Sequence, residues 1–193
     1  MNVIADRHIP DVVRLQLAVH ADARGHFVES YQRVSYSDLF GVPFSPQQHN
    51  VSFSRKKVLR GLHYQRSYPQ AKLVRVLKGQ VLDVVVDLRP DSASYARHTA
   101  YTLYGPEYVD TQPHQQLWVP AGCAHGFYVL SDDALVEYSC DAVYQPNDDY
   151  SLLWNDPALA IDWPDVNPVV SPKDQQARRL AQIEQAGLLP ILP

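Results

Sequence analysis

Short β-rich runs separated by turn residues fill most of this chain, from about residue 12 to residue 163. Runs in which apolar and polar residues alternate, or in which valine and leucine dominate, are typical of β-strands. Lys78-Gly79 and Ser131-Asp132-Asp133 supply turn residues between neighbouring runs. Many short strands at regular spacing are typical of a sandwich or a jelly roll, so we expect an all-β fold. The predicted strands cover residues 13–19, 72–88 in two parts, 98–104, 115–120, 125–131 and 134–144.

Helical signals occur in two places. The sequence SYSDLFG at residues 35–41, closed by a glycine, predicts a short helix. Further on, Ser171 precedes a proline and a polar run that ends at Gly187, and this order of N-cap, proline and terminal glycine predicts a helix over about 171–187. With 193 residues we expect one domain, 1–193, with an N-terminal strand extension and this C-terminal helix.

Composition argues against several classes of partner. The net charge is −4 and no block of like charge occurs, so neither nucleic acid nor an anionic membrane is an expected partner. The sequence shows no signal-peptide pattern and no apolar stretch of membrane-spanning length, and we expect a cytoplasmic protein. Cys123 and Cys140 lack CxxC spacing; a disulfide is compatible with the sequence, but buried free thiols are the commoner case.

Two histidine-bearing runs indicate a site inside the β structure: VLRGLHYQ at residues 58–65 and VPAGCAHGF at residues 119–127. Metal-binding cupins use two histidines one residue apart, a nearby carboxylate, and a third histidine after a Pro-x-Gly turn. His125 follows such a turn, but His63 stands alone, and Lys72 occupies the region of the expected carboxylate. Two imidazoles are fewer ligands than a metal site normally needs, so we expect neither a metal nor another cofactor.

Cations near the same histidines indicate an anionic ligand. Arg60 lies beside His63 in the run at residues 58–65, and Lys72 and Arg75 lie in the predicted strand that follows. Burying cations without an anionic partner is costly, and a negatively charged ligand would offset that cost.

Several longer segments carry a resemblance. VLRGLHYQ and the segments named below resemble the dTDP-4-dehydrorhamnose 3,5-epimerase family. The similarity extends over about residues 10–175. The resemblance implies a jelly-roll fold of the cupin type (a double-stranded β-helix), a homodimer, and a metal-free reaction. It also implies a dTDP-deoxysugar substrate, dTDP-4-dehydro-6-deoxy-D-glucose, inverted at C3 and C5 to dTDP-4-dehydro-L-rhamnose. The matching segments are DARGHFVES, PQAKLVRVLKGQVLDVVVDLR, LWVPAGCAHGFYVLSD, LWNDPALAIDWP and SPKD.

The resemblance assigns four catalytic roles, and each suits its residue type. His63 would be the base, because an imidazole can take and release a proton near neutral pH. Asp174 would orient that imidazole and stabilise its charged form. Lys72 would face the C4 oxygen and favour the enolate, and Tyr138 would return a proton from the opposite face.

The resemblance also assigns the residues that bind the nucleotide sugar. Arginine suits the diphosphate because its planar fork donates two parallel hydrogen bonds. In this family an N-terminal strand of one subunit completes the partner's site, so Glu29 would act across the interface. The implied set is Arg24, Arg60, His125 and Lys173 for the diphosphate or sugar, Glu29 and Gln48 for the thymine, and Asn50 and Asp149 as further contacts.

Three departures from the family pattern leave alternatives open. His49 stands where aspartate is common, Lys57 where glycine is usual, and Ser139 where lysine is frequent. The alternatives are an epimerase that inverts C3 only or C5 only, a metal-dependent cupin enzyme, and a binding module without activity.

Overall fold

The structure, a computed structural model, describes residues 1–192, and most of its regular elements are strands. Three short helices and two 3-10 turns complete it: α1 (Arg33–Phe40), α2 (Pro172–Gln175), α3 (Leu180–Gln185), η1 (Pro106–Tyr108) and η2 (Pro146–Asp148). The strands are β1 (Asn2–Ala5), β2 (Val13–Gln16), β3 (His20–Asp22), β4 (Gly25–Phe27), β5 (Gln48–Arg55), β6 (Leu59–Gln65), β7 (Lys72–Lys78), β8 (Gln80–Asp87), β9 (His98–Tyr104), β10 (Gln115–Val119), β11 (Cys123–Val129), β12 (Asp133–Cys140) and β13 (Asp149–Ser151).

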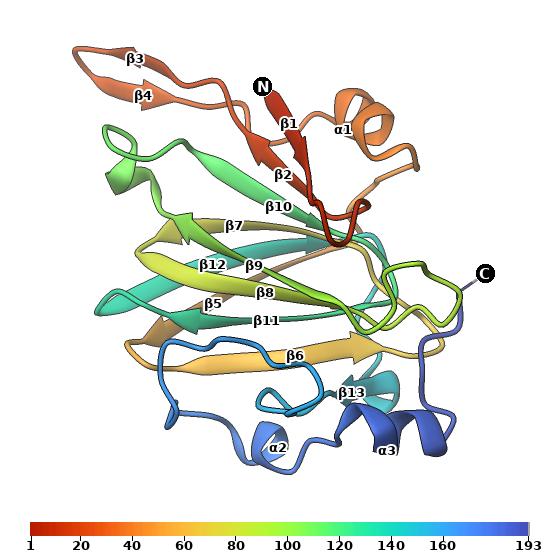
Figure 1. Cartoon of the computed structure of the whole chain (residues 1–193). Coiled ribbons are helices and arrows are strands. Elements are labelled where there is room, and N and C mark those ends of the chain that lie inside the picture. Colours follow the sequence, from red (N-terminus) through yellow and green to blue (C-terminus); the bar gives the residue numbers. More distant parts are fainter. Residues whose placement is uncertain (193) are drawn as a thin grey trace.

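Two antiparallel sheets form the body of the molecule (Figure 1). One has the order β1-β2-β10-β7-β12-β5 and the other the order β13-β6-β11-β8-β9. Residues that alternate along the strands, such as Val74, Val85, Leu117 and Val129, are fully buried in one cluster to which both sheets contribute. This arrangement confirms the predicted all-β jelly roll.

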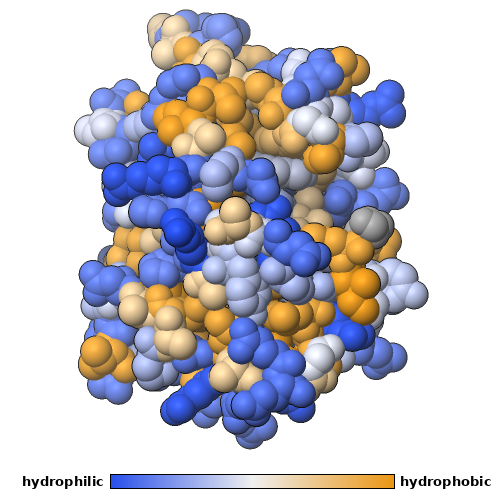
Figure 2. Space-filling view, turned by 45° about the vertical axis from the view of Figure 1, so that its right-hand side comes forward, coloured by the Kyte–Doolittle hydropathy of each residue, from blue (hydrophilic) through white to orange (hydrophobic). Residues whose placement is uncertain are grey.

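The outer faces of the two sheets are covered differently. Over part of the six-stranded sheet, Tyr36 of α1 and Phe44 pack on the outward side chains of β2, β7 and β10, and Phe40 stacks on Trp118 at 3.9 Å between ring centroids. The C-terminal segment packs Ile183 of α3 against the five-stranded sheet. On the face shown in Figure 2, the hydrophobic side chains lie in separate groups among hydrophilic ones.

A small hairpin stands apart from both sheets. Strands β3 and β4 pair only with each other, and every residue in them is exposed. In Figure 1 the hairpin extends away from the body at the end opposite α2 and α3.

Most predicted elements are confirmed, with shifted ends. The run 98–104 is β9 without change, and the run 72–88 divides into β7 and β8 at Gly79, whose φ of 83° suits the turn. The N-terminal helix begins two residues earlier than predicted, at Arg33, and ends at a left-handed Gly41. Both cysteines are buried free thiols, as expected.

The continuous C-terminal helix predicted over 171–187 is wrong. Ser171 does cap a helix, but α2 ends at Gln175 and α3 begins only at Leu180. Between them the backbone of Arg178 bonds to Ser151 and Leu153 next to β13 instead of continuing the helical ladder. This pairing with a distant segment interrupts a locally favourable helix. No helix among residues 1–192 is long and apolar enough to cross a membrane.

Candidate active site

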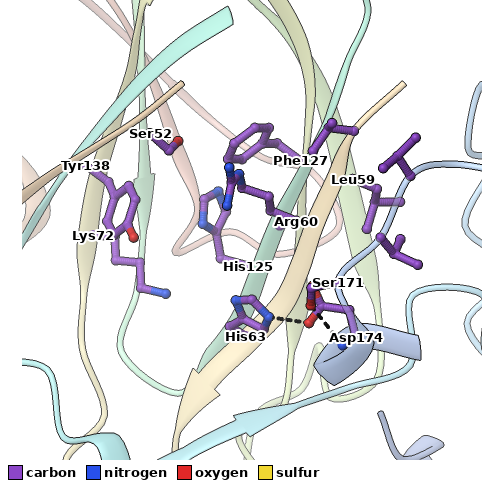
Figure 3. A pocket seen from close by; sticks show the side chains of 14 residues that line it. Ser52, Leu59, Arg60, His63, Lys72, His125, Phe127, Tyr138, Ser171 and Asp174 are labelled. Carbon is purple, nitrogen blue, oxygen red and sulfur yellow. Dashed lines mark hydrogen bonds and ion pairs between the residues drawn. The ribbon is translucent and has the colours of Figure 1, made fainter. Parts of the chain in front are cut away.

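A cavity of about 430 Å³ opens between the two sheets, and a second of about 340 Å³ adjoins it. His63, Lys72 and Tyr138 line both. Volumes of this size are typical of sites for small molecules. Figure 3 shows that the side chains come from opposite walls of the first cavity: His63 and His125 from the five-stranded sheet, Lys72 and Tyr138 from the six-stranded sheet.

Close contact between β6 and β11 shapes the first wall. The register between these strands shifts between His125 and Phe127. A side chain at Gly61 would place its Cβ 2.6 Å from the Cα of Gly126, so the two backbones approach each other only because both positions are glycine. This irregularity interrupts the strict alternation of a strand and lets Arg60 and His63, three residues apart, face the same cavity.

Regular alternation places the residues of the second wall. Lys72, Val74 and Val76 of β7 point inward, as do Val136 and Tyr138 of β12, which pairs with β7. The pairing of β12 with β7 is regular from Val136 to Cys140, so the lysine and the tyrosine face the cavity from neighbouring strands by alternation alone.

His63 and Asp174 form a hydrogen-bonded pair. The distance between His63 Nε2 and Asp174 Oδ1 is 2.6 Å, and the dashed line in Figure 3 marks it. Burial would raise the pKa of Asp174, but hydrogen bonds from His63 and Ser171 outweigh burial and hold this pKa below its usual value. An ionised carboxylate only accepts hydrogen bonds, so Nε2 carries the proton and Nδ1 of His63 is the nitrogen available to a ligand.

His125 has a matching carboxylate that the sequence reasoning missed. Its Nε2 lies 2.8 and 3.0 Å from the two carboxylate oxygens of Asp83, which is fully buried on β8. The signal was present, because Asp83 stands between the apolar residues Val81 and Val85 on the inward face of β8. Each imidazole of the cavity is thus bonded to its own aspartate, and within residues 1–192 no three His, Cys, Asp or Glu side chains cluster as a metal site.

Lys72 is buried and Tyr138 is partly buried. Burial lowers the pKa of the Lys72 ammonium, with Cys140 and Asp149 opposing that effect, and no carboxylate of the described chain lies within ion-pair distance of it. Burial, followed by the effect of Cys140, raises the pKa of the Tyr138 phenol, and the charge of Arg60 opposes this. The arrangement provides a buried cation without an anion and a phenol that keeps its proton.

The adjoining cavity holds several of the predicted nucleotide-binding residues. Gln48, Asn50 and Asp149 line it, and the amide of Gln48 donates to Asn50 at 2.8 Å. Lys173 lines neither cavity but forms an ion pair with Asp149. Tyr144, which sequence reasoning also missed, donates its hydroxyl hydrogen bond to Asp149 at 2.7 Å.

Besides Lys173, two predicted residues are not brought to either cavity. Arg24 lies at the tip of the β3–β4 hairpin, where its partner is Asp22 two residues away, and Glu29 is exposed just after β4. Neither lines either cavity. Their contribution to the site stays a prediction that requires a second subunit.

Two of the three departures from the family pattern contact each other, and the third lies in a turn. His49 and Ser139 are opposite each other on β5 and β12, and His49 Nδ1 lies 2.8 Å from the Ser139 hydroxyl. The two departures are therefore one paired change. Lys57 has a φ of 67°, in the left-handed region that favours glycine, which explains why glycine would suit this turn.

Comparisons with known proteins identify what the chain is similar to. The family model described as dTDP-4-dehydrorhamnose 3,5-epimerase matches residues 6–182. The chain is 42% identical to the enzyme of that name from Escherichia coli (strain K12) over 191 residues, which are 98% of this chain and 100% of the relative.

Solved structures agree in fold. The dTDP-6-deoxy-D-glucose-3,5-epimerase of Legionella pneumophila, solved in complex with dTDP-4-keto-L-rhamnose, has a TM-score of 0.91 and 41% identity and covers 100% of this chain and 98% of its own. A 3'-monoepimerase of Streptomyces bikiniensis in complex with dTDP-quinovose has a TM-score of 0.87 and 33% identity, covering 97% and 92%.

Proposed function

Because the chain belongs to the dTDP-4-dehydrorhamnose 3,5-epimerase family, we propose that it converts dTDP-4-dehydro-6-deoxy-D-glucose to dTDP-4-dehydro-L-rhamnose by inverting C3 and C5. One observation carries the proposal: the His63–Asp174 pair lies on one wall of a cavity whose opposite wall presents Tyr138 and Lys72. Inversion of a carbon centre needs a base on one side and an acid on the other, and this cavity has both.

The first step is removal of a proton from a carbon next to the C4 ketone. Nδ1 of His63 takes the proton, the electron pair of the broken C–H bond forms a carbon–carbon double bond, and the carbonyl electrons move onto the C4 oxygen. Lys72 stabilises the resulting enolate oxygen by its charge, while Asp174 stabilises the imidazolium. The buried, unpaired state of Lys72 suits this role because the enolate supplies the missing anion.

The second step returns a proton from the other side. The enolate collapses to the ketone, and its carbon takes the proton of the Tyr138 hydroxyl on the wall opposite His63, which inverts the centre. Burial raises the pKa of this phenol, so Tyr138 is protonated before each step. Solvent takes the proton from His63 and restores that of Tyr138, and the same sequence at the second carbon completes the double inversion.

The remaining residues bind the nucleotide. Arg60 and His125 line the first cavity and bind the diphosphate or sugar, while Gln48 and Asn50 in the adjoining cavity bind the thymine end. Asp149, with Lys173 bonded to it, contacts the substrate at the same opening.

The protein is proposed to act as a homodimer. Arg24 and Glu29 of the partner subunit would complete each site, which explains why these residues lie on an exposed segment far from the cavity of their own chain. Val51 and Phe53 on the outward face of β5 are more than half exposed and offer an apolar surface for the second copy. A dissolved sugar nucleotide is the only reactant, so we place the reaction in the cytoplasm.

The proposal can be tested by incubating the protein with dTDP-4-dehydro-6-deoxy-D-glucose in D2O. We expect deuterium at both C3 and C5, because each inversion exchanges one carbon-bound hydrogen with solvent. Mass spectrometry counts the deuterium atoms and NMR locates them. Exchange at neither carbon would reject the proposal. Exchange at one carbon would favour a single-site epimerase, the second candidate, which the similarity to the Streptomyces bikiniensis 3'-monoepimerase supports.

A further inference from the structure

Arg60 crosses the opening of the cavity from one sheet to the other. It belongs to β6 of the five-stranded sheet, but its guanidinium contacts β5, the edge strand of the six-stranded sheet. Its Nε donates a hydrogen bond to Ser54 Oγ at 2.8 Å, and its Nη2 donates to the carbonyl of Phe53 at 3.2 Å. Both acceptors are uncharged, so the chain orients the positive charge without neutralising it.

These two bonds use one particular edge of the guanidinium. The group has five N–H donors in a fixed plane, and Nε together with Nη2 forms its side edge. The end edge, formed by Nη1 and Nη2, keeps donors that point away from β5. Figure 3 shows Arg60 reaching into the space between Phe127 and Tyr138, where such donors would meet a ligand. An end edge held in one plane suits the two parallel hydrogen bonds that phosphate oxygens accept.

Ser54 is the side chain that holds this geometry. It is 3% exposed, it lies opposite Ala134 on β12, and it is not among the residues that line the cavity. It therefore reaches the ligand only through Arg60. Alanine at this position would leave Nε without its acceptor and free the side chain to rotate away from β5.

We propose that Ser54 is a positioning residue, whose hydroxyl fixes Arg60 so that the free edge of the guanidinium receives the diphosphate of the substrate. This inference rests on the proposed function, in which Arg60 binds the diphosphate. It adds a residue of β5 that no sequence signal or family resemblance pointed to.

The first experiment compares Ser54→Ala and Ser54→Thr with the unchanged protein, using dTDP as the ligand in calorimetry and the sugar nucleotide in kinetics. For Ser54→Ala we expect the Kd for dTDP and the KM to rise about 5- to 20-fold, while kcat stays within about twofold. This is less than the roughly 10- to 150-fold equivalent of a whole hydrogen bond to a charged group, because Arg60 keeps its bond to the carbonyl of Phe53. Ser54→Thr keeps the hydroxyl and should restore the affinity. A merely structural role would lower thermal stability without this division between KM and kcat.

A matched control uses a second buried serine. Ser94 lies outside both cavities and donates to Asp87 at 2.7 Å, so Ser94→Ala also removes a buried hydrogen bond. It should lower the melting temperature and leave the Kd for dTDP unchanged. An equal loss of affinity in Ser94→Ala would mean that Ser54 acts through general stability, and would overturn the inference.

A double-mutant cycle separates this inference from the proposed function. Arg60→Ala should weaken dTDP binding strongly, and adding Ser54→Ala to it should cause no further loss, because Ser54 acts only through that arginine. If Arg60→Ala weakens binding and Ser54→Ala does not, the inference is wrong and the proposed function stands. If Arg60→Ala leaves dTDP binding unchanged, the assignment of Arg60 to the diphosphate is wrong.

Discussion

The interior between the two sheets, called the barrel below, and the β3–β4 hairpin carry residues that family resemblance assigns to the same substrate. The residues of the barrel are largely buried, whereas those of the hairpin are exposed. Lys72, His125 and Asp174 are buried, and the two aspartates and histidines of the cavity are paired by short hydrogen bonds. The Arg24 side chain on the hairpin is 90% exposed and pairs only with a residue of its own turn. The strands and α2 position the first group, whereas within residues 1–192 the Arg24 side chain is held only by its own turn.

This difference separates chemistry from recognition. The groups proposed to move protons depend on one chain alone, because buried neighbours fix their orientation. The groups on the hairpin can be fixed only by a second surface, since an exposed ion pair such as that of Arg24 and Asp22 contributes little to order. Under the proposed function, one subunit would therefore hold the complete proton-transfer set and an incomplete nucleotide site.

The largest expected effect is the loss of activity when the base is removed. Mixing subunits of two variants should restore part of this activity. His63→Asn should lower kcat at least about 10²-fold, and the hairpin variant Arg24→Ala/Glu29→Ala should weaken substrate binding. If each site combines the barrel of one subunit with the hairpin of the other, mixed dimers contain one intact site. Equal amounts of the two variants, allowed to exchange subunits, should then recover about a quarter of the unmutated activity, measured by turnover.

The control for this mixing experiment is an equal mixture of two single variants, His63→Asn and Tyr138→Phe. Both changes lie in the barrel, so a mixed dimer of these two variants has a defect in each site. Recovery in this pair, or activity of the first mixture equal to the average of its components, would contradict the division between barrel and hairpin.

A smaller effect concerns the stability cost of the buried lysine. Burial lowers the pKa of Lys72 in the folded protein, so at neutral pH the fold tolerates a charge that the unfolded chain solvates freely. Lys72→Met should therefore raise the free energy of unfolding by about 1–2 kcal/mol while abolishing most activity. Thermal denaturation without ligand measures this. Arg24→Met, which alters an exposed cation, should leave the melting temperature unchanged; a lower melting temperature for Lys72→Met would contradict the cost of burial.

The smallest effect should appear in acid. The pKa of Asp174 in the folded protein is below the ordinary value of 3.8, so its hydrogen bonds stabilise the fold above that pH, and this contribution disappears as the pH falls through the folded-state pKa. In Asp174→Asn, the fall in the free energy of unfolding below about pH 4 should be smaller by about 1 kcal/mol than in the unchanged protein. Melting temperatures between pH 5 and 2.5 test this. Asp22→Asn on the hairpin is the variant expected to show a smaller change, because the ion pair of Asp22 with Arg24 is exposed to solvent.

The sequence predicts the parts of the fold that local patterns govern. β9 was located without error because alternation and flanking turn residues define residues 98–104 on both sides. The break between α2 and α3 was missed because the backbone of Arg178 pairs with Ser151, and no local pattern reveals that contact. The ends of strands likewise depend on which neighbour supplies the hydrogen bonds.

The candidate site shows the same limit. Family resemblance pointed to His63, Lys72, Tyr138 and Asp174, and all four converge on one cavity. It did not reveal Asp83 or Ser54, which act on other side chains rather than on the ligand and are recognised only from distances. Nor did it reveal that His49 and Ser139 are hydrogen-bonded partners, because pairing across strands depends on a register that the sequence does not state.

The position of Asp174 along the chain has a consequence for synthesis on the ribosome. Every strand of both sheets is translated before α2, so the nascent barrel can close while the carboxylate partner of His63 has yet to be made. Premature termination just before Ser171 would give a polypeptide that keeps Arg60, Lys72 and His125 but lacks the aspartate. Such a fragment would also lack Ile183 of α3, which packs on the five-stranded sheet, so both the site and the cover of that sheet are completed only in the last part of synthesis.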